Sequence, residues 1–307
     1  MMTLTIVSCL SNPLGLSCRR KLFESFRRHV VEDVGVPLVV VECLYGTEIP
    51  QNWQHPLYHH MVVHSSSVMW HKENLLNIGI RHILDTCRDC TAIAWVDADI
   101  EFLSPRIVES TVLRILQKHP MCQVWNVALD SGPEPGSVLK TQYASTSDIR
   151  ARDRVLESEN QCGYGWAATT SFLGETGGLL ETCIIGGGDR VMMQACEGKV
   201  ATPALDLSYS AGYRRCIREW TVKAVAACRG VVGSCPLLIR HGFHGFKSNR
   251  GYTRRYEVLK SHGFDPHLDI TKNEDGVWEW SASASPELRE DVVTYFRSRQ
   301  EDVLSTK

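Results

Sequence analysis

The sequence lacks several features that would narrow its class at once. It has no apolar run near the length of about eighteen residues that a membrane-spanning helix needs. Its net charge is only −2, so the chain as a whole does not indicate binding to nucleic acid or to an anionic membrane. It has no internal repeat, and with 43% hydrophobic residues among 307 it is not typical of a disordered chain. These absences leave a globular protein with a sizeable core.

The first residues do not predict export. The apolar start, residues 3–10, has no basic leading region and meets Ser-Asn-Pro at 11–13, which predicts a first strand rather than a signal peptide. The 12 cysteines are scattered, and the close pair Cys87 and Cys90 lacks the second pair that a zinc ribbon needs. We therefore expect free thiols and a cytoplasmic protein, or one of the host-cell cytoplasm if its source is viral.

Strands and helices alternate through the first hundred residues. Apolar β-branched runs predict strands, and apolar residues at helical spacing predict helices. Strands are expected at 3–9, 37–43, 58–64 and 91–96, and helices at 19–34 and 72–84. This alternation predicts an α/β, Rossmann-like fold of three layers with a central, mostly parallel sheet. Ligands then bind beyond the carboxyl ends of the strands.

The pattern changes after residue 102 but still predicts one compact domain. Helices are expected at 107–118 and 207–229, and strands at 123–129 and 236–240. We expect the domain to span 1–256, with halves at 1–102 and 103–256, and a C-terminal extension at 257–307 to pack on it.

Two aspartates directly follow the apolar strand at 91–96. Asp97 and Asp99 have one residue between them, so on an extended chain they share a side and can face one divalent cation. A buried carboxylate needs a partner or a metal. The pair alone is a weak signal, because Asp-x-Asp occurs by chance and Asp often ends a strand.

A second acidic residue follows three glycines. The run Gly186-Gly187-Gly188-Asp189 ends an apolar stretch that predicts a strand, and glycines let a bulky ligand such as a sugar ring approach the backbone. Asp189 could then act as a general base on a hydroxyl. The alternative is that Asp189 caps a helix over 190–196.

The stretch 239–255 is the densest in polar chemistry. His241 and His244 follow a predicted strand and are flanked by glycines, so an imidazole can reach the carboxylates. Lys247 and Arg250 can bind phosphate oxygens. A solvated basic loop is the alternative interpretation.

Two further elements carry candidate ligand contacts. Lys72 and Asn77 lie in the helix that precedes the aspartate strand, whose first turn offers backbone donors to an anion. Trp166 lies between small residues and could stack on a sugar or base, although a buried Trp is more often part of a core.

The order of these motifs resembles the GT-A fold glycosyltransferases, which use nucleotide sugars. Along residues 3–256 the order is Lys-x-x-x-x-Asn-x-Gly, Asp-x-Asp, Gly-x-x-Trp-Ala, Gly-Gly-Gly-Asp and His-Gly-x-x-x-x-Arg-x-Tyr. The chain is similar to compact glycosyltransferases of bacteria, phages and large DNA viruses. By this resemblance, 1–102 is the donor half and 103–256 the acceptor half.

The resemblance implies a metal centre that holds the donor diphosphate. Asp99 would be a direct ligand of Mn²⁺ or Mg²⁺, Asp97 would approach the metal or the ribose, and His244 would complete the site, with His241 as second choice. A UDP-sugar is the favoured donor.

Nucleotide and donor-sugar contacts follow from the same resemblance. Asn12 and Glu42, after the first strand and at the end of the second, would hold nucleobase and ribose. Lys72 and Asn77 would contact nucleotide or sugar.

The acceptor side is also implied. Asp189 would be the base of an inverting, hexosyltransferase-type reaction, and Trp166, Gly187 and Gly188 would line the acceptor site. This chain has Arg190 where better-known members have a second acid.

The acceptor itself stays open between two classes. It is either a glycan or small hydroxylated molecule, or a hydroxymethylated DNA base, which the basic stretches 27–29, 214–215 and 240–260 would favour if they shared a face. Alternative functions are a nucleotidyltransferase, which would normally carry a glycine-rich loop after the first strand, and a non-catalytic module that binds nucleotide sugars.

Overall fold

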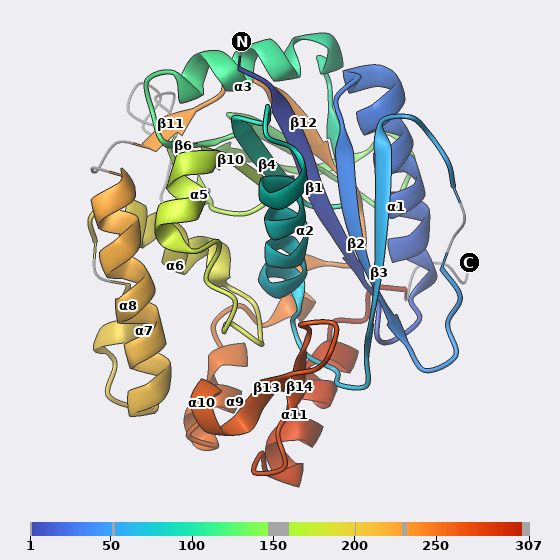
Figure 1. The fold of residues 1–307 in the computed structure, drawn as a ribbon. Helices are drawn as coiled ribbons and strands as arrows, with labels where there is room; N and C mark the ends of the chain where they lie inside the picture. The colour runs from blue at the N-terminus through green and yellow to red at the C-terminus, as the bar shows by residue number, and fades with distance from the viewer. Residues whose placement is uncertain (1, 51–52, 147–159, 200, 229–231, 303–307) are drawn as a thin grey trace.

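Helices enclose a central sheet in the computed structural model of this protein (Figure 1). The structure describes residues 2–50, 53–146, 160–199, 201–228 and 232–302. Within this part of the chain, no helix is long and apolar enough to cross a membrane.

The central sheet has seven strands in the order β11-β6-β10-β4-β1-β2-β3. Their bounds are β1 Leu4–Ser11, β2 Leu38–Tyr45, β3 Tyr58–Ser65, β4 Ala92–Val96, β6 Met121–Gln123, β10 Gly165–Thr169 and β11 Val232–Ser234. Only β10 runs against its neighbours, and the other pairs are parallel. The predicted α/β class with a mostly parallel sheet is confirmed.

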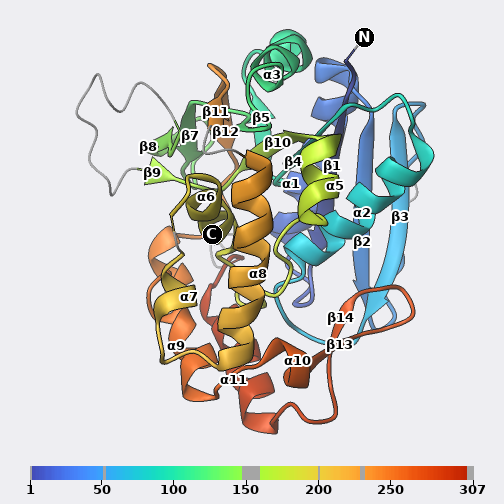
Figure 2. The ribbon, with the colours of Figure 1, turned by 60° about the vertical axis from the view of Figure 1, so that its left-hand side comes forward.

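Side chains alternate between the two faces of the sheet, as an extended chain requires. On one face, Val7 and Trp95 pack with α2 (Lys72–Thr86), α5 (Thr170–Thr176), α6 (Gly188–Cys196) and α8 (Ala211–Cys228). On the other face, Ile6 and Ala94 pack with α1 (Ser17–Arg28) and α3 (Val108–Leu116). Figure 2 shows α2, α5 and α8 on one side of the sheet and α1 beyond it. The fold therefore has three layers.

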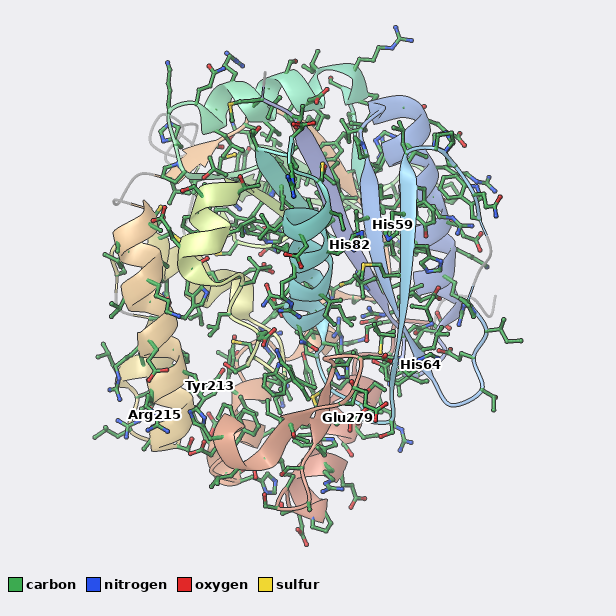
Figure 3. The ribbon with its side chains drawn as sticks, in the orientation of Figure 1. His59, His64, His82, Tyr213, Arg215 and Glu279 are labelled. Carbon is green, nitrogen blue, oxygen red and sulfur yellow. The ribbon has the colours of Figure 1, made fainter. Side chains whose placement is uncertain are left out.

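Helix α2 lies unusually close to the sheet because of Gly79. A Cβ at this position would stand 2.6 Å from Cγ2 of Val7 in β1. At the edge strand, His59 of β3 stacks on His82 of α2 with ring centroids 4.4 Å apart (Figure 3). These contacts hold the second half of α2 against β1 and β3.

A second sheet brings later residues to the same edge. Its order is β5-β12-β7-β8-β9, with β5 Ile100–Phe102, β7 Val127–Ser131, β8 Val138–Ala144, β9 Asn160–Gln161 and β12 Leu238–His241. The single strand predicted over 123–129 is wrong, because the chain crosses from one sheet to the other there. The fully buried Trp125 marks the crossing, and Asn126 already bonds through its N–H to the Leu237 carbonyl.

Two other local predictions needed correction. The helix expected over 19–34 is α1 followed by a π-helical turn, His29–Val34. The apolar stretch 179–185 is not a strand, since it forms an irregular segment whose side chains, such as Ile184 and Ile185, are buried in the core beside α2 and α8.

The C-terminal part lies at the carboxyl edge of the central sheet. It contains α9 Arg255–Ser261, α10 Pro266–Asp269, the hairpin β13 Ile270–Lys272 with β14 Trp278–Trp280, and α11 Pro286–Ser298. Figure 1 shows these elements gathered below the strands. Glu279 of the hairpin accepts hydrogen bonds from Ser66 and Ser67, just after β3. Remaining short helices are Pro105–Ile107, Thr202–Leu205 and Lys247–Arg250.

Candidate functional site

A cavity of about 1070 Å³ opens at the carboxyl ends of the central strands. Its walls come from the segments after β1 and β4, the first turns of α2 and α6, the loop after β12, and the chain beyond α11. This is the position at which open α/β sheets bind ligands. The volume is of the size that small-molecule sites occupy.

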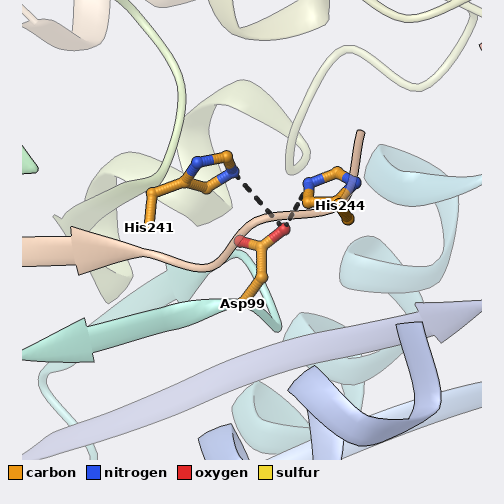
Figure 4. A group of neighbouring side chains, drawn as sticks. All are labelled: Asp99, His241 and His244. Atoms are coloured by element: carbon orange, nitrogen blue, oxygen red, sulfur yellow. Dashed lines mark ion pairs between the residues drawn. The ribbon is translucent and has the colours of Figure 1, made fainter. Parts of the chain in front are cut away.

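Beside the second sheet, Asp99, His241 and His244 form a group of side chains that could hold a metal ion, here called the metal group. His241 ends β12, where it pairs with Ile100 of β5 and with Asp130 of β7. The Gly242 N–H donates to the Asp99 carbonyl at 2.8 Å, which holds the two segments together. Nε2 of His244 lies 3.0 Å and Nε2 of His241 3.6 Å from Oδ2 of Asp99 (Figure 4).

A carboxylate also faces the other nitrogen of each histidine. Nδ1 of His241 lies 3.1 Å from Oδ1 of Asp130, and Nδ1 of His244 lies 3.3 Å from Oε2 of Glu301. Carboxylates in this position orient metal-binding imidazoles and fix which nitrogen is protonated. Both Nε2 atoms are thus directed at the same oxygen of Asp99.

Charges around the histidines set their protonation. Burial would raise the pKa of Asp99, but His241 and His244 lower it well below its usual value. Burial would lower the pKa of His241, yet Asp99 and Asp130 raise it. Burial and Arg250 lower the pKa of His244, whose Nε2 is 2.9 Å from Nη2 of Arg250. A neutral imidazole is the form that binds a metal.

The group fits a divalent cation. One ligand atom each from Asp99, His241 and His244 lies within 4.8 Å of the others. Oδ1 of Asp99 is buried and has no hydrogen-bond partner among the described residues, so it is available as a ligand. A carboxylate with two imidazoles is a ligand set that suits a divalent transition-metal ion.

Asp97 faces a different partner. Nζ of Lys72, at the start of α2, lies 2.6 Å from Oδ1 of Asp97 and 2.9 Å from Oδ2 of Asp189. Burial would lower the pKa of Lys72, but the two carboxylates raise it well above its usual value, so the ammonium is retained. Burial raises the pKa of Asp97. Asp97 was predicted beside the metal with Asp99 and His244, but the metal group contains His241 and not Asp97.

The glycine turn before α6 fits tightly around its neighbours. Gly187 has φ +94°, and a Cβ there would collide with the hydroxyl of Tyr256. A Cβ on Gly188 would lie 2.8 Å from Oε1 of Glu73. Asp189 lies within the first turn of α6, whose cap residue is Gly187, so it does not cap a helix that begins at 190. Its side chain reaches Lys72 instead.

Most sequence-predicted site residues line this cavity. They are Asn12, Lys72, Asp97, Asp99, Gly187, Asp189, His244, Lys247 and Arg250. The side chain of Asn12, however, bonds to the backbone of Leu16 through both its oxygen and its nitrogen. Lys247 donates to Oδ2 of Asp130 at 2.6 Å.

Four predicted residues do not line the cavity. Glu42 lies inside β2, which runs on to Tyr45, and its Oε2 is 2.9 Å from Nε2 of His60. Asn77 instead bonds to the backbone of Leu179 through its amide. The others, Trp166 and Gly188, are buried, and the indole of Trp166 donates to the Cys162 carbonyl.

Several residues at the site were not expected from the sequence. Arg19 and Arg299 both bind Glu301, and Tyr164 donates to Asp130 at 2.6 Å. Asp130 could have been identified as a candidate, because it is an acidic residue directly after the strand predicted over 123–129. No pattern marks Glu301, because it lies 282 positions from Arg19.

Comparisons with known proteins give only structural likenesses. A search with the sequence found no matching protein-family model and no matching curated protein. Two crystal structures of S. aureus TarS 1–349 superpose with TM-scores of 0.39 and 0.42 at 9% and 10% identity, the second in complex with UDP-GlcNAc. They match 84% and 80% of this chain and 64% and 60% of theirs, so this chain spans less than two-thirds of TarS 1–349. The catalytic domain of Drosophila β1,4-galactosyltransferase 7, in complex with xylobiose, gives 0.39 at 10% identity over 92% of this chain and 93% of its own.

Proposed function

We propose that the protein is a metal-dependent glycosyltransferase of the GT-A type, transferring a sugar from a nucleotide diphosphate to a hydroxyl. The observation that carries the proposal is the group Asp99, His241 and His244 at the carboxyl edge of the sheet, in a cavity with a cationic wall. When bound, a divalent ion there supplies charge stabilisation to the leaving diphosphate.

The cationic wall would hold the donor's diphosphate. Arg250 and Arg255 line the cavity beside the metal group, and Arg255 also stacks against the ring of Tyr256. Guanidinium groups suit bidentate contact with phosphate. Lys72 would place a further positive charge at the donor sugar while keeping Asp97 and Asp189 in position. A UDP-sugar is the favoured donor.

Asp189 is the proposed base of an inverting reaction. Its side chain is 19% exposed and lines the cavity, and Nζ of Lys72 holds one of its oxygens. A carboxylate at this place can accept the proton of the incoming hydroxyl. Asp189→Asn should preserve the Lys72 contact and donor binding but reduce kcat by roughly 10²-fold or more.

Among acceptors, local charge favours a glycan or small hydroxylated molecule over DNA. Some of the basic residues proposed for a DNA surface form ion pairs within the chain, since Arg240 pairs with Glu101 at 2.7 Å and Lys260 with Asp206 at 3.1 Å. Arg27 is 6% exposed and lies over the ring of Trp53. A DNA acceptor predicts transfer to duplex DNA that falls steeply with salt.

A cytoplasmic location is part of the proposal. The 12 cysteines form no disulfide, and Sγ of Cys122 lies 3.8 Å from Sγ of Cys235. Reducing compartments keep thiols in this state. Fractionation of the source cells would test this part of the proposal.

A thermal-shift screen tests the donor, and product analysis tests the reaction. Nucleotide sugars are added with and without Mn²⁺ to the wild type and to Asp99→Ala, followed by transfer assays on a panel of glycans and DNA. We expect a Mn²⁺-dependent rise in Tm that Asp99→Ala abolishes. Nucleoside diphosphate release with transfer supports the proposal, pyrophosphate release points to a nucleotidyltransferase, and binding without turnover points to a non-catalytic module.

A further inference from the structure

The residues that follow α11 lie beside the metal group, where Glu301 reaches His244. Arg299 and Glu301 are 4% and 5% exposed, although they lie near the end of the chain. Nε and Nη2 of Arg19 donate to the two oxygens of Glu301 at 2.6 and 2.9 Å, and Nη2 of Arg299 lies 2.7 Å from Oε1. Two guanidinium groups therefore fix this carboxylate in one orientation.

A helix terminus and a glycine turn hold the same segment in place. Asp302 accepts hydrogen bonds from the backbone N–H groups of Ser17 and Cys18 at 2.7 and 3.0 Å. These are the first donors of α1, and no side chain of its own caps this helix. A Cβ on Gly245, at φ +85°, would lie 3.0 Å from Cα of Glu301. The histidine loop and the C-terminal segment thus fit closely against each other.

We propose that Glu301 is a positioning residue of the metal centre, so that segment 299–302 is a part of the site rather than a peripheral tail. Oε2 of Glu301 lies 3.3 Å from Nδ1 of His244, as Oδ1 of Asp130 lies 3.1 Å from Nδ1 of His241. Each carboxylate keeps the proton on Nδ1 and turns Nε2 toward Asp99. One of these carboxylates comes from the second sheet, and the other comes from the C-terminal segment.

A role confined to pairing with arginine would not require this geometry. The carboxylate of Glu301 could neutralise Arg19 and Arg299 without approaching a histidine. Instead, Oε2 is shared between Nε of Arg19 and Nδ1 of His244. Removing such a carboxylate typically costs 10- to 100-fold in metal affinity. This assignment rests on the proposed metal site.

Metal titrations of the 307-residue chain test the assignment without any activity measurement. Mn²⁺ affinity is measured by electron paramagnetic resonance, and the visible spectrum of bound Co²⁺ reports ligand geometry. The variants are Glu301→Ala and Glu301→Gln, the second retaining an oxygen for Arg19 and His244. Glu290→Gln is the matched control, because it removes a carboxylate of the same residue type from an exposed position of α11, away from the metal group.

We expect Glu301→Ala to raise the Kd for Mn²⁺ about tenfold or more and to change the Co²⁺ spectrum. Glu301→Gln should show a smaller rise in Kd than Glu301→Ala, together with a lower Tm because Arg19 and Arg299 lose their shared counter-charge. Glu290→Gln should match the wild type. Wild-type affinity and spectrum in both Glu301 variants would overturn the assignment alone. A wild type that binds neither ion would overturn the proposed metal site, and the assignment with it.

Discussion

Glu73 provides a quantitative test of how burial governs charge beside the cavity. It lies in the first turn of α2, is 2% exposed, and its Oε1 has no hydrogen-bond partner within the described part of the chain. Burial raises the pKa of this carboxyl from 4.5 to about 8, with Asp189 adding to the rise and Lys72 opposing it. Glu73 is therefore mostly protonated in the folded protein at neutral pH.

The raised pKa makes the protein less stable as the pH rises. Below pH 4.5 the carboxyl is protonated in both the folded and the unfolded chain, so it contributes nothing. Between 4.5 and about 8 only the unfolded chain ionises, and each pH unit costs about 1.4 kcal/mol. The cost approaches about 4 kcal/mol at about pH 7.5 and levels off above the folded pKa.

Glu73→Gln removes this cost with little change of shape. Its Tm should equal that of the wild type near pH 4.5 and exceed it by up to roughly 6 °C near pH 7.5, taking about 2.1 cal/mol/K per residue for the unfolding entropy. Thermal unfolding followed across this range measures the difference. Glu109→Gln, at an exposed first-turn position of α3, is the matched control and should show no growth with pH. A Glu73→Gln difference that is flat or negative throughout would refute the reasoning.

Three further predictions concern Lys72, the glycine turn before α6 and the metal ion. Lys72→Met leaves Asp97 and Asp189 without their shared ammonium and should lower the free energy of unfolding in urea by roughly 3 kcal/mol; an unchanged midpoint and slope would contradict it. Gly187→Ala places a Cβ at a positive φ and against the hydroxyl of Tyr256, so it should lower the free energy of unfolding in urea by about 1–3 kcal/mol. The double variant with Tyr256→Phe should recover part of this loss, and a double variant no more stable than the single one would contradict the role of the hydroxyl. With free Mn²⁺ at 100 times its Kd, removal of the ion by a chelator should lower the free energy of unfolding by about 2.7 kcal/mol and so lower the Tm. An equal Tm with and without chelator would argue against binding to the folded state.

The spacing of apolar residues predicted the layers well, because within helices and strands this spacing reflects which side chains are buried. The strands of the first hundred residues lie where apolar β-branched runs placed them. The prediction for Asp97 and Asp99 was less complete, since β4 ends at Val96 and both aspartates lie beyond it. Period-two spacing no longer holds there, so one aspartate faces Lys72 and the other faces the histidines.

Similar local reasons explain the residues placed elsewhere. Glu42 was expected at a strand end, but β2 continues to Tyr45 and keeps the side chain within the sheet. Lys72 and Asn77 are five positions apart on a helix, which turns them about 140° from each other, so they cannot share a ligand. Glu301 could not be found at all, because its role depends on tertiary contacts with Arg19.

The most direct test of the central claim is the electron paramagnetic resonance spectrum of Mn²⁺ bound to the protein in the presence of UDP. The account predicts one bound Mn²⁺ per chain, a line that broadens when the diphosphate carries a magnetic oxygen isotope, and loss of binding in Asp99→Asn and His241→Gln. Broadening would show that the ion contacts the diphosphate. Mn²⁺ that binds equally well to both variants, or a line that the labelled diphosphate leaves unchanged, would contradict the account.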